Sequence, residues 1–144
     1  MGHVSASKDL AASPESVWAT ISDTSTWDSW LTIHAGWLET PPAELSVGAK
    51  LVEKVVMLGM ANKLEWTVSA IERGSSLTIE GKGMAGVTSK FSFALAPNGT
   101  GTTVNIEAEF AGQLIVGALG KAVEKDAAEN LEDTLEKLAA TASA

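Results

Sequence analysis

The sequence predicts an α+β fold in which a curved antiparallel β-sheet of about seven strands wraps around one long C-terminal α-helix, with two short helices after the first strand. Two observations predict this fold. From Ala49 to Phe110 apolar and polar residues mostly alternate, which is the period of half-buried strands. Residues 112–142 instead carry apolar residues at helical spacing. Because the strands are apolar on one face only, that face needs a cover, and the helix supplies it.

The N-terminal elements follow from alternation and from capping residues. Residues 3–11 alternate with period two and are expected to form the first strand. Ser13 is then a suitable N-cap, and Pro14 suits the first position of a helix. A short helix is therefore expected from Pro14 to about Ser22.

The next stretch, DTSTWDSW, places two tryptophans three residues apart in a chain with five Trp and no Tyr. Ser25 and Asp28 have the spacing of a capping box, so a second short helix is expected from Thr26 to about Ile33. Trp27 and Trp30 would then share one face of that helix.

The alternating region divides into six strands, expected at residues 35–39, 50–58, 62–71, 76–83, 87–95 and 102–110. The inward face is clear for the last four of these strands. It is not clear for the strand that contains Glu53, because apolar residues compete for both of its faces. A final helix of some 28 residues would be about 40 Å long, longer than any strand it covers.

Hairpins of a meander point alternately to opposite ends of the sheet, which sorts the loops into two groups. One end collects the polar turns RGSS and PNGTG. The other collects MLGMAN (57–62), GKGMAG (81–86) and FAGQLIVG (110–117), which are apolar and rich in glycine. Apolar loops with methionine favour a deformable mouth or contact surface, although they would also suit a small core under the end of the sheet.

Composition excludes several classes of function. A net charge of −8 with scattered Lys and Arg argues against nucleic acid as a partner. The chain has no Cys and two His, His3 and His34, without ligand spacing, so we expect neither a metal site nor a cofactor. GKGMAG matches the dinucleotide fingerprint, but strands are expected on both sides of it, which excludes that interpretation.

The same composition favours a cytoplasmic protein. No apolar run approaches the ~20 residues of a membrane-spanning helix, and the first residues lack the apolar segment of a secretory signal. We therefore expect no integral membrane segment and a cytoplasmic location.

Three polar residues remain as candidates for chemistry. His34, just after the second helix, is expected at a helix end or on the surface. Glu53 would be a buried carboxylate if its strand face turned inward. Asn130 lies on the apolar side of the long helix, where a buried amide needs partners. It would bond either to the short helices or to a ligand in a cavity.

The order of elements, the stretch PESVWATISD (14–23), the following WDSW and the later VGAKL (47–51) together resemble the START-like, helix-grip superfamily (SRPBCC). Within it, the chain is most similar to small bacterial proteins of the polyketide cyclase/dehydrase and lipid transport type. The resemblance covers nearly all of residues 1–144 and implies a single START-like domain. It also implies a hydrophobic tunnel between the sheet and the long helix, entered at the end with the methionine loops.

These expectations lead to a preferred function, the binding or carriage of a small hydrophobic ligand such as a lipid, isoprenoid or polyketide, without catalysis. The expected ligand-binding residues are Trp30, Leu64, Trp66, Val68, Ile79, Phe91, Phe93, Val104, Ile106, Leu119, Val123 and Asn130. The expected cavity mouth is formed by Met57, Met60, Met84 and Leu114. Within this cavity, Trp27 is assigned to packing, while Trp30 either packs or lines the closed end.

Two alternatives stay open. The first is a cyclase/dehydratase-type enzyme that uses His34 or Glu53 and requires at least one of them to face the cavity. Family cyclases rely on pocket Arg, Tyr, Ser or His, whereas this chain has no Tyr and carries its Arg73 in a polar turn at the other end. The second alternative is a toxin or regulatory protein of a toxin-antitoxin pair. Its apolar loop end would then bind a partner protein or a second copy of the chain.

Overall fold

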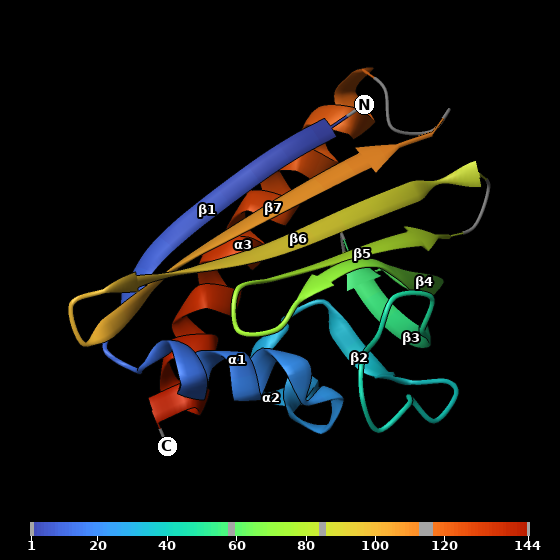
Figure 1. Cartoon of the computed structure of the whole chain (residues 1–144). Coiled ribbons are helices and arrows are strands. Elements are labelled where there is room, and N and C mark those ends of the chain that lie inside the picture. The colour runs from blue at the N-terminus through green and yellow to red at the C-terminus, as the bar shows by residue number, and fades with distance from the viewer. Residues whose placement is uncertain (1, 58–59, 84–85, 113–116, 144) are drawn as a thin grey trace.

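The computed structural model describes residues 2–57, 60–83, 86–112 and 117–143. Seven antiparallel strands form one sheet in the order β1-β7-β6-β5-β4-β3-β2, which curls around the C-terminal helix (Figure 1). The strands are β1 (Gly2–Leu10), β2 (His34–Trp37), β3 (Lys50–Met57), β4 (Met60–Glu72), β5 (Ser76–Lys82), β6 (Thr88–Asn98) and β7 (Gly101–Ala111). The predicted α+β helix-grip fold is confirmed.

Consecutive strands from β2 to β7 pair with their neighbours in the chain, and β1 joins the far edge by pairing with β7. Residues on one face of the sheet are buried and those on the other are exposed, as the alternation predicts. On β6, for example, Phe91 and Phe93 are buried while Thr88 and Lys90 are exposed. The buried face meets α3 (Gly117–Ser143), which crosses behind β1, β7 and β6 in Figure 1.

Helix α1 (Pro14–Ser22) begins as its sequence predicts. The Ser13 side chain accepts a hydrogen bond from the Ser16 backbone N–H at 3.2 Å, and Pro14 occupies the first turn. Val17 and Ile21 are buried from this helix. Together with α2 (Trp27–Trp30), α1 closes the end of the sheet opposite the N-terminus and contacts α3 (Figure 1).

The second helix is shorter than predicted. A 3-10 turn, η1 (Thr24–Thr26), precedes a four-residue helix α2 (Trp27–Trp30), and Leu31 is already extended. The expected capping box does not form, since the Ser25 hydroxyl donates to the Asp23 carboxylate at 2.6 Å, and Asp23 also accepts from the Ser25 backbone N–H. The prediction of a helix to Ile33 was wrong, because the chain becomes extended at Leu31 and then makes a turn into β2, with Leu31 and Ile33 buried in the core.

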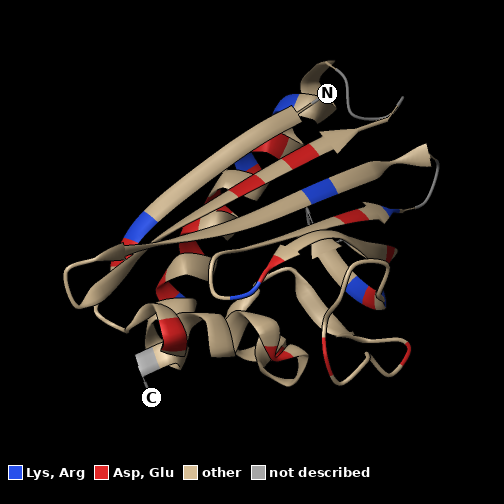
Figure 2. Ribbon diagram, viewed as in Figure 1, with Lys and Arg blue, Asp and Glu red and all other residues tan. Residues whose placement is uncertain are grey.

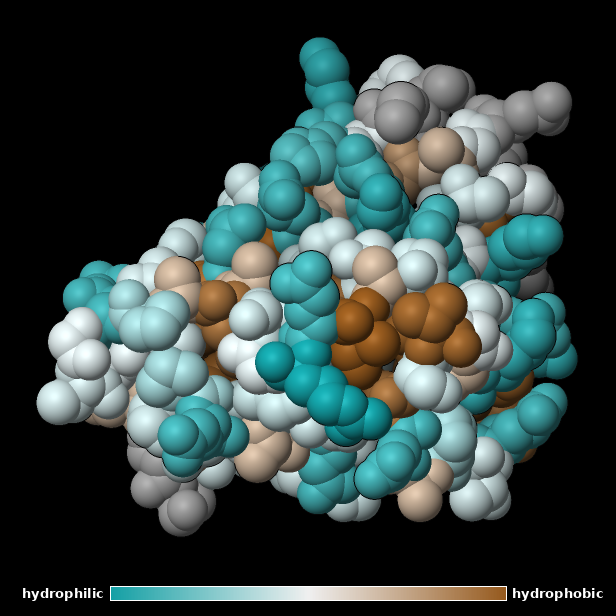
Figure 3. Space-filling model, viewed as in Figure 1, coloured by the Kyte–Doolittle hydropathy of each residue, from teal (hydrophilic) through white to brown (hydrophobic). Residues whose placement is uncertain are grey.

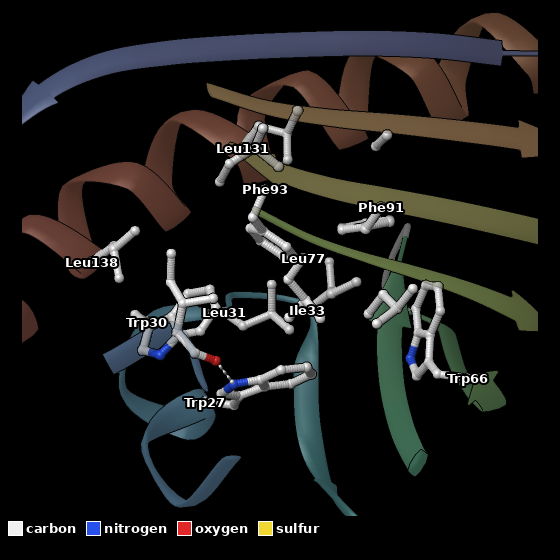
Figure 4. Close-up of a cluster of buried hydrophobic side chains, with 14 of the residues drawn as sticks. Trp27, Trp30, Leu31, Ile33, Trp66, Leu77, Phe91, Phe93, Leu131 and Leu138 are labelled. Carbon is white, nitrogen blue, oxygen red and sulfur yellow. Dashed lines mark hydrogen bonds between the residues drawn. The ribbon is translucent and has the colours of Figure 1, made fainter. Parts of the chain in front are cut away.

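Both tryptophans of α2 are buried in this lower part of the core (Figure 4). Their rings meet edge to face with centroids 5.8 Å apart. The Trp27 ring N–H donates to the Ile21 carbonyl at 2.9 Å, and the Trp30 ring N–H donates to the Thr26 hydroxyl at 3.0 Å. Trp27 thereby joins α2 to α1. Its burial is explained by this contact between the two helices.

Strands β3, β5 and β7 all finish at the same end of the sheet. Met57 pairs with Met60 at the end of the β3–β4 ladder, and Lys82, Thr88 and Ala111 lie in one row across β5, β6 and β7. The grouping of loops at this end therefore follows the expected meander.

Charged residues are spread over the sheet and α3, with Lys and Arg separated from one another (Figure 2). Within the described ranges, no helix has the length and hydropathy needed to cross a lipid bilayer.

Candidate functional site

The interior between the sheet and α3 is where ligand-binding residues were expected. Most of the predicted set is buried there in one hydrophobic cluster: Trp30, Leu64, Trp66, Val68, Ile79, Phe91, Phe93, Val104, Ile106 and Val123. Leu119 lies instead near the start of α3 with 43% of its surface exposed. The helical spacing placed Leu119 on the apolar stripe, but the first turn of α3 extends beyond the part that the sheet covers.

Aromatic rings form a continuous row through this interior (Figure 4). Trp30 meets Phe93 edge to face at 5.9 Å between centroids, and Phe93 lies 6.4 Å from Phe91. Phe91 in turn meets Trp66 at 5.4 Å and Phe110 at 6.1 Å, both edge to face. Edge-to-face pairs of this kind add about 0.5–1.5 kcal/mol each beyond their burial. The row links the short helices at one end of the interior to the methionine-loop end.

A buried polar cluster lies beside this row. Glu53 of β3 is 0% exposed, so its strand face does turn inward. One carboxylate oxygen accepts a hydrogen bond from the Trp66 ring N–H at 2.6 Å. The other bonds the Nδ1 atom of His34, whose side chain is 2% exposed. A carboxylate can be buried at tolerable cost only when both oxygens are satisfied in this way.

His34 therefore does not lie on the surface as expected. It begins β2, where it pairs with Val55 just before a register shift, and its ring stacks near Trp37 with centroids 4.7 Å apart. Sequence reasoning missed this placement because β2 has four residues, too few for alternation to show a face. With Nδ1 engaged by Glu53, the other ring nitrogen, Nε2, makes no hydrogen bond to a described residue.

Gly81 explains how the Trp66 ring is accommodated. The two residues are direct partners on β4 and β5. A Cβ atom added to Gly81 would lie 2.6 Å from Cε3 of Trp66, which is closer than any real contact. The first glycine of GKGMAG thus provides room for the indole ring rather than for a phosphate, and strands flank the motif on both sides.

Asn130 has partners within the protein. Its amide oxygen accepts from the Thr32 hydroxyl at 2.8 Å, and its amide nitrogen donates to the Asp126 carbonyl at 2.9 Å. The Thr32 backbone N–H also donates to the Thr134 hydroxyl at 3.3 Å. Asn130 was predicted to bond either to the short helices or to a ligand. In the structure it links α3 to the segment that follows α2.

The predicted cavity mouth falls largely outside the described residues. Met84 and Leu114 belong to ranges that the structure does not describe, and for Met57 and Met60 only the backbone pairing is described. Their assignment to a mouth stays a prediction.

Two hollows occur elsewhere in the described part of the chain. One, of about 410 Å³, runs over the outer face of the sheet between the side chains of Glu80, Lys82, Thr88 and Lys90. The other, of about 230 Å³, lies between α1 and the end of β4, beside Leu45 and Arg73. In the space-filling view the outer face of the sheet is largely hydrophilic, with a few hydrophobic groups near its middle (Figure 3). The lining of the first hollow also includes Gly81, Ser89 and Phe110. Neither hollow is lined by Trp30, Phe93, Phe91 or Trp66 of the aromatic row.

Solved structures share this architecture over the whole chain. A START superfamily protein from Mycobacterium smegmatis superposes with a TM-score of 0.82 at 21% identity, covering 99% of this chain and 98% of that one. Protein CV1439 from Chromobacterium violaceum superposes with a TM-score of 0.77 at 16% identity, covering 100% and 99%. At these identities the likeness establishes the fold.

Sequence comparison gives relatives of similar length. The chain is 29% identical over 136 residues to a Mycobacterium tuberculosis protein named Toxin Rv0910, covering 94% of both chains. It is 27% identical over 139 residues to the uncharacterized protein Rv1546 of the same organism, covering 96% of this chain and 97% of that one. The family model described as polyketide cyclase / dehydrase and lipid transport matches residues 1–143. With its curled sheet, its long C-terminal helix and this match, the chain belongs to that family and has the START-like helix-grip fold.

Proposed function

We propose that the protein binds or carries a small hydrophobic ligand in the interior between the sheet and α3. The observation that carries the proposal is the composition of this interior, a run of apolar and aromatic side chains from β4 to β7 and α3 that encloses one polar cluster. Ligand pockets have this character, since apolar walls provide affinity and a few polar groups provide orientation. Family membership supports the same conclusion.

In this proposal the ligand enters at the methionine-loop end and displaces or spreads the side chains nearest to it. The exposure of Leu119 supports this route, because it leaves an apolar side chain accessible in the first turn of α3. Affinity would come mainly from apolar burial, about 25 cal/mol per Å². The range of accepted ligands should therefore be broad.

The test begins with the purified protein. Organic extraction followed by mass spectrometry should detect a co-purified apolar molecule, and the stripped protein should bind long-chain alcohols by calorimetry. Val68→Phe adds bulk on the buried face and should weaken binding about tenfold or more. Val56→Phe adds the same bulk at an exposed position of β3 and should leave binding unchanged. Absence of any bound molecule together with absence of heat on titration would rule the proposal out.

A second candidate is a cyclase/dehydratase-type enzyme, and the burial of both His34 and Glu53 favours it. Glu53 would orient the imidazole through Nδ1, so that Nε2 acts as general base or acid. Elimination of water from a β-hydroxy ketone, followed by mass spectrometry, tests this candidate. His34→Gln should abolish the reaction, and no turnover by the unaltered protein would exclude it for this substrate class.

A third candidate rests on the relative named a toxin. Here the chain would arrest growth by binding a partner protein at its apolar loop end. Induced expression should then slow growth, and co-expression of a neighbouring gene product should restore it. Normal growth at high expression would argue for the carrier instead.

A further inference from the structure

Ser89 of β6 is buried with its hydroxyl unused. The residue is 5% exposed, and its Oγ has no hydrogen-bond partner among the described residues. Its neighbours Thr88 and Lys90 are exposed on the outer face, so the Ser89 side chain points to the inner face, as Phe91 does. An unsatisfied hydroxyl in a native interior calls for an explanation, because leaving it without a partner costs free energy.

Ser89 lies beside a glycine and two aromatic residues in the sheet. In the register of the sheet, Trp66, Gly81, Ser89 and Phe110 lie in one row across β4, β5, β6 and β7. Gly81 has no side chain, and the six-membered ring of Trp66 reaches over it. Neighbouring strands are about 4.8 Å apart, so the edge of the indole ring ends roughly one strand from the free hydroxyl. This row lies towards the end of the sheet where the ligand is proposed to enter.

The buried charged groups determine which ligands can bind in this part of the interior. Glu53 is the charged residue among the buried side chains that the structure describes, and both of its oxygens already accept hydrogen bonds or bond His34. The Trp66 ring N–H is likewise used by Glu53, so Trp66 offers a ligand its ring surface alone. No Lys or Arg is buried among the described residues, and His34 is already bonded to Glu53, so a carboxylate ligand would find no free cation in the interior to balance it. A neutral ligand avoids that penalty.

We propose that the Ser89 hydroxyl is the hydrogen-bonding point for the ligand, and that the ligand class is neutral, ring-bearing molecules with one hydroxyl or carbonyl group. The ligand ring would lie against the face of the Trp66 ring that is turned away from Gly81, and the polar group would reach Ser89. A serine hydroxyl both donates and accepts, so it serves a hydroxyl or a carbonyl equally. This inference rests on the proposed function and names the ligand class of that same interior.

The test uses three probes with one ring system: 2-naphthol, naphthalene and 2-naphthoate. Dissociation constants come from NMR titration of the full chain, followed through the ring N–H signals of the tryptophans. The unaltered protein should prefer 2-naphthol to naphthalene by about 3- to 10-fold, the worth of one hydrogen bond. It should bind 2-naphthoate the most weakly.

Ser89→Ala should remove the preference for 2-naphthol and leave the affinity for naphthalene unchanged. Ser92→Ala is the matched control, since Ser92 lies on the same strand with its hydroxyl on the other face, bonded to Thr78. It should behave as the unaltered protein. Ser89→Ala should also keep or raise the melting temperature, because it removes an unsatisfied buried group.

The outcomes separate the two proposals. Binding of 2-naphthol with the same preference in Ser89→Ala as in the unaltered protein would overturn the role of Ser89 and leave the carrier function standing. Tighter binding of 2-naphthoate than of 2-naphthol would overturn the neutral ligand class. If no probe binds any variant while each gives the NMR spectrum of a folded protein, the ligand class fails, and the carrier function is decided separately by the extraction and the titration with long-chain alcohols.

Discussion

The ring N–H of Trp66 donates a hydrogen bond of 2.6 Å to the carboxylate of Glu53, and both side chains are buried. The two residues belong to adjacent strands, β4 and β3. If either side chain were removed, the polar group of the other would be buried without this partner, which costs free energy. Glu53 also bonds His34 and so ties the short edge strand β2 to the body of the sheet. Removing the carboxylate should therefore affect three strands at once.

Glu53→Ala should lower the free energy of unfolding by about 3 kcal/mol, because it leaves the imidazole and the indole N–H buried without their shared acceptor. Glu53→Gln should cost less, since the amide oxygen still accepts one hydrogen bond. Urea unfolding measures both. The matched control is Glu65→Ala on β4, whose exposed carboxylate pairs with Lys63 and should contribute less than about 1 kcal/mol. Equal losses at the two positions would contradict the structural importance of the cluster.

Gly81→Ala should destabilise the protein by about 1–3 kcal/mol, since its methyl group would overlap the Trp66 ring. Gly83→Ala serves as control, because its added atom meets only the end of the flexible Leu64 side chain at 3.0 Å. In a Trp66→Phe background the cost of Gly81→Ala should shrink, as the smaller ring frees space. Thermal unfolding of the unaltered protein, of Gly81→Ala, of Trp66→Phe and of the double variant completes the cycle. Strictly additive losses would show that the two residues do not interact.

Thr134→Val tests the link between α3 and the segment after α2. The substitution keeps the shape of a buried side chain but removes the oxygen that accepts from the Thr32 backbone N–H. We expect a loss of about 1–2 kcal/mol in urea unfolding. Thr88→Val, the same change at an exposed position of β6, should have little effect. A neutral result at Thr134 would mean that the bond to Asn130 and packing hold α3 to this segment without the Thr134 hydroxyl.

Trp27→Phe should cost about 1–3 kcal/mol, because the Ile21 carbonyl loses its donor and the smaller ring leaves space in the core. Trp18→Phe is the control. Trp18 is partly buried on α1, and no hydrogen bond from its ring is recorded within the described residues. Chemical unfolding should therefore separate the two variants clearly, and a larger loss at Trp18 would refute the assignment of Trp27 to the link between α1 and α2.

Short-range signals in the sequence predicted much of the fold. Ser13 and Pro14 start α1 as capping rules require, and alternation identified the strands from β3 to β7 and the buried faces of β4 to β7. The same approach failed at α2. A capping box is defined by two residues alone. It therefore does not predict that the Ser25 hydroxyl donates to Asp23 instead, or that Leu31 leaves the helix and enters the core.

By itself the sequence determined the fold class, the sorting of loops between the two ends of the sheet and most of the apolar interior, because periodicity reports which face of an element is buried. The tertiary structure alone decided the polar chemistry of that interior. Whether Glu53 faced inward depended on its pairing with β4, and the burial of His34 depended on a register shift in a four-residue strand. The free hydroxyl of Ser89 likewise depends on which side chains reach it across the sheet. Contacts between residues far apart in the chain set these features, and local patterns of sequence carry no direct record of them.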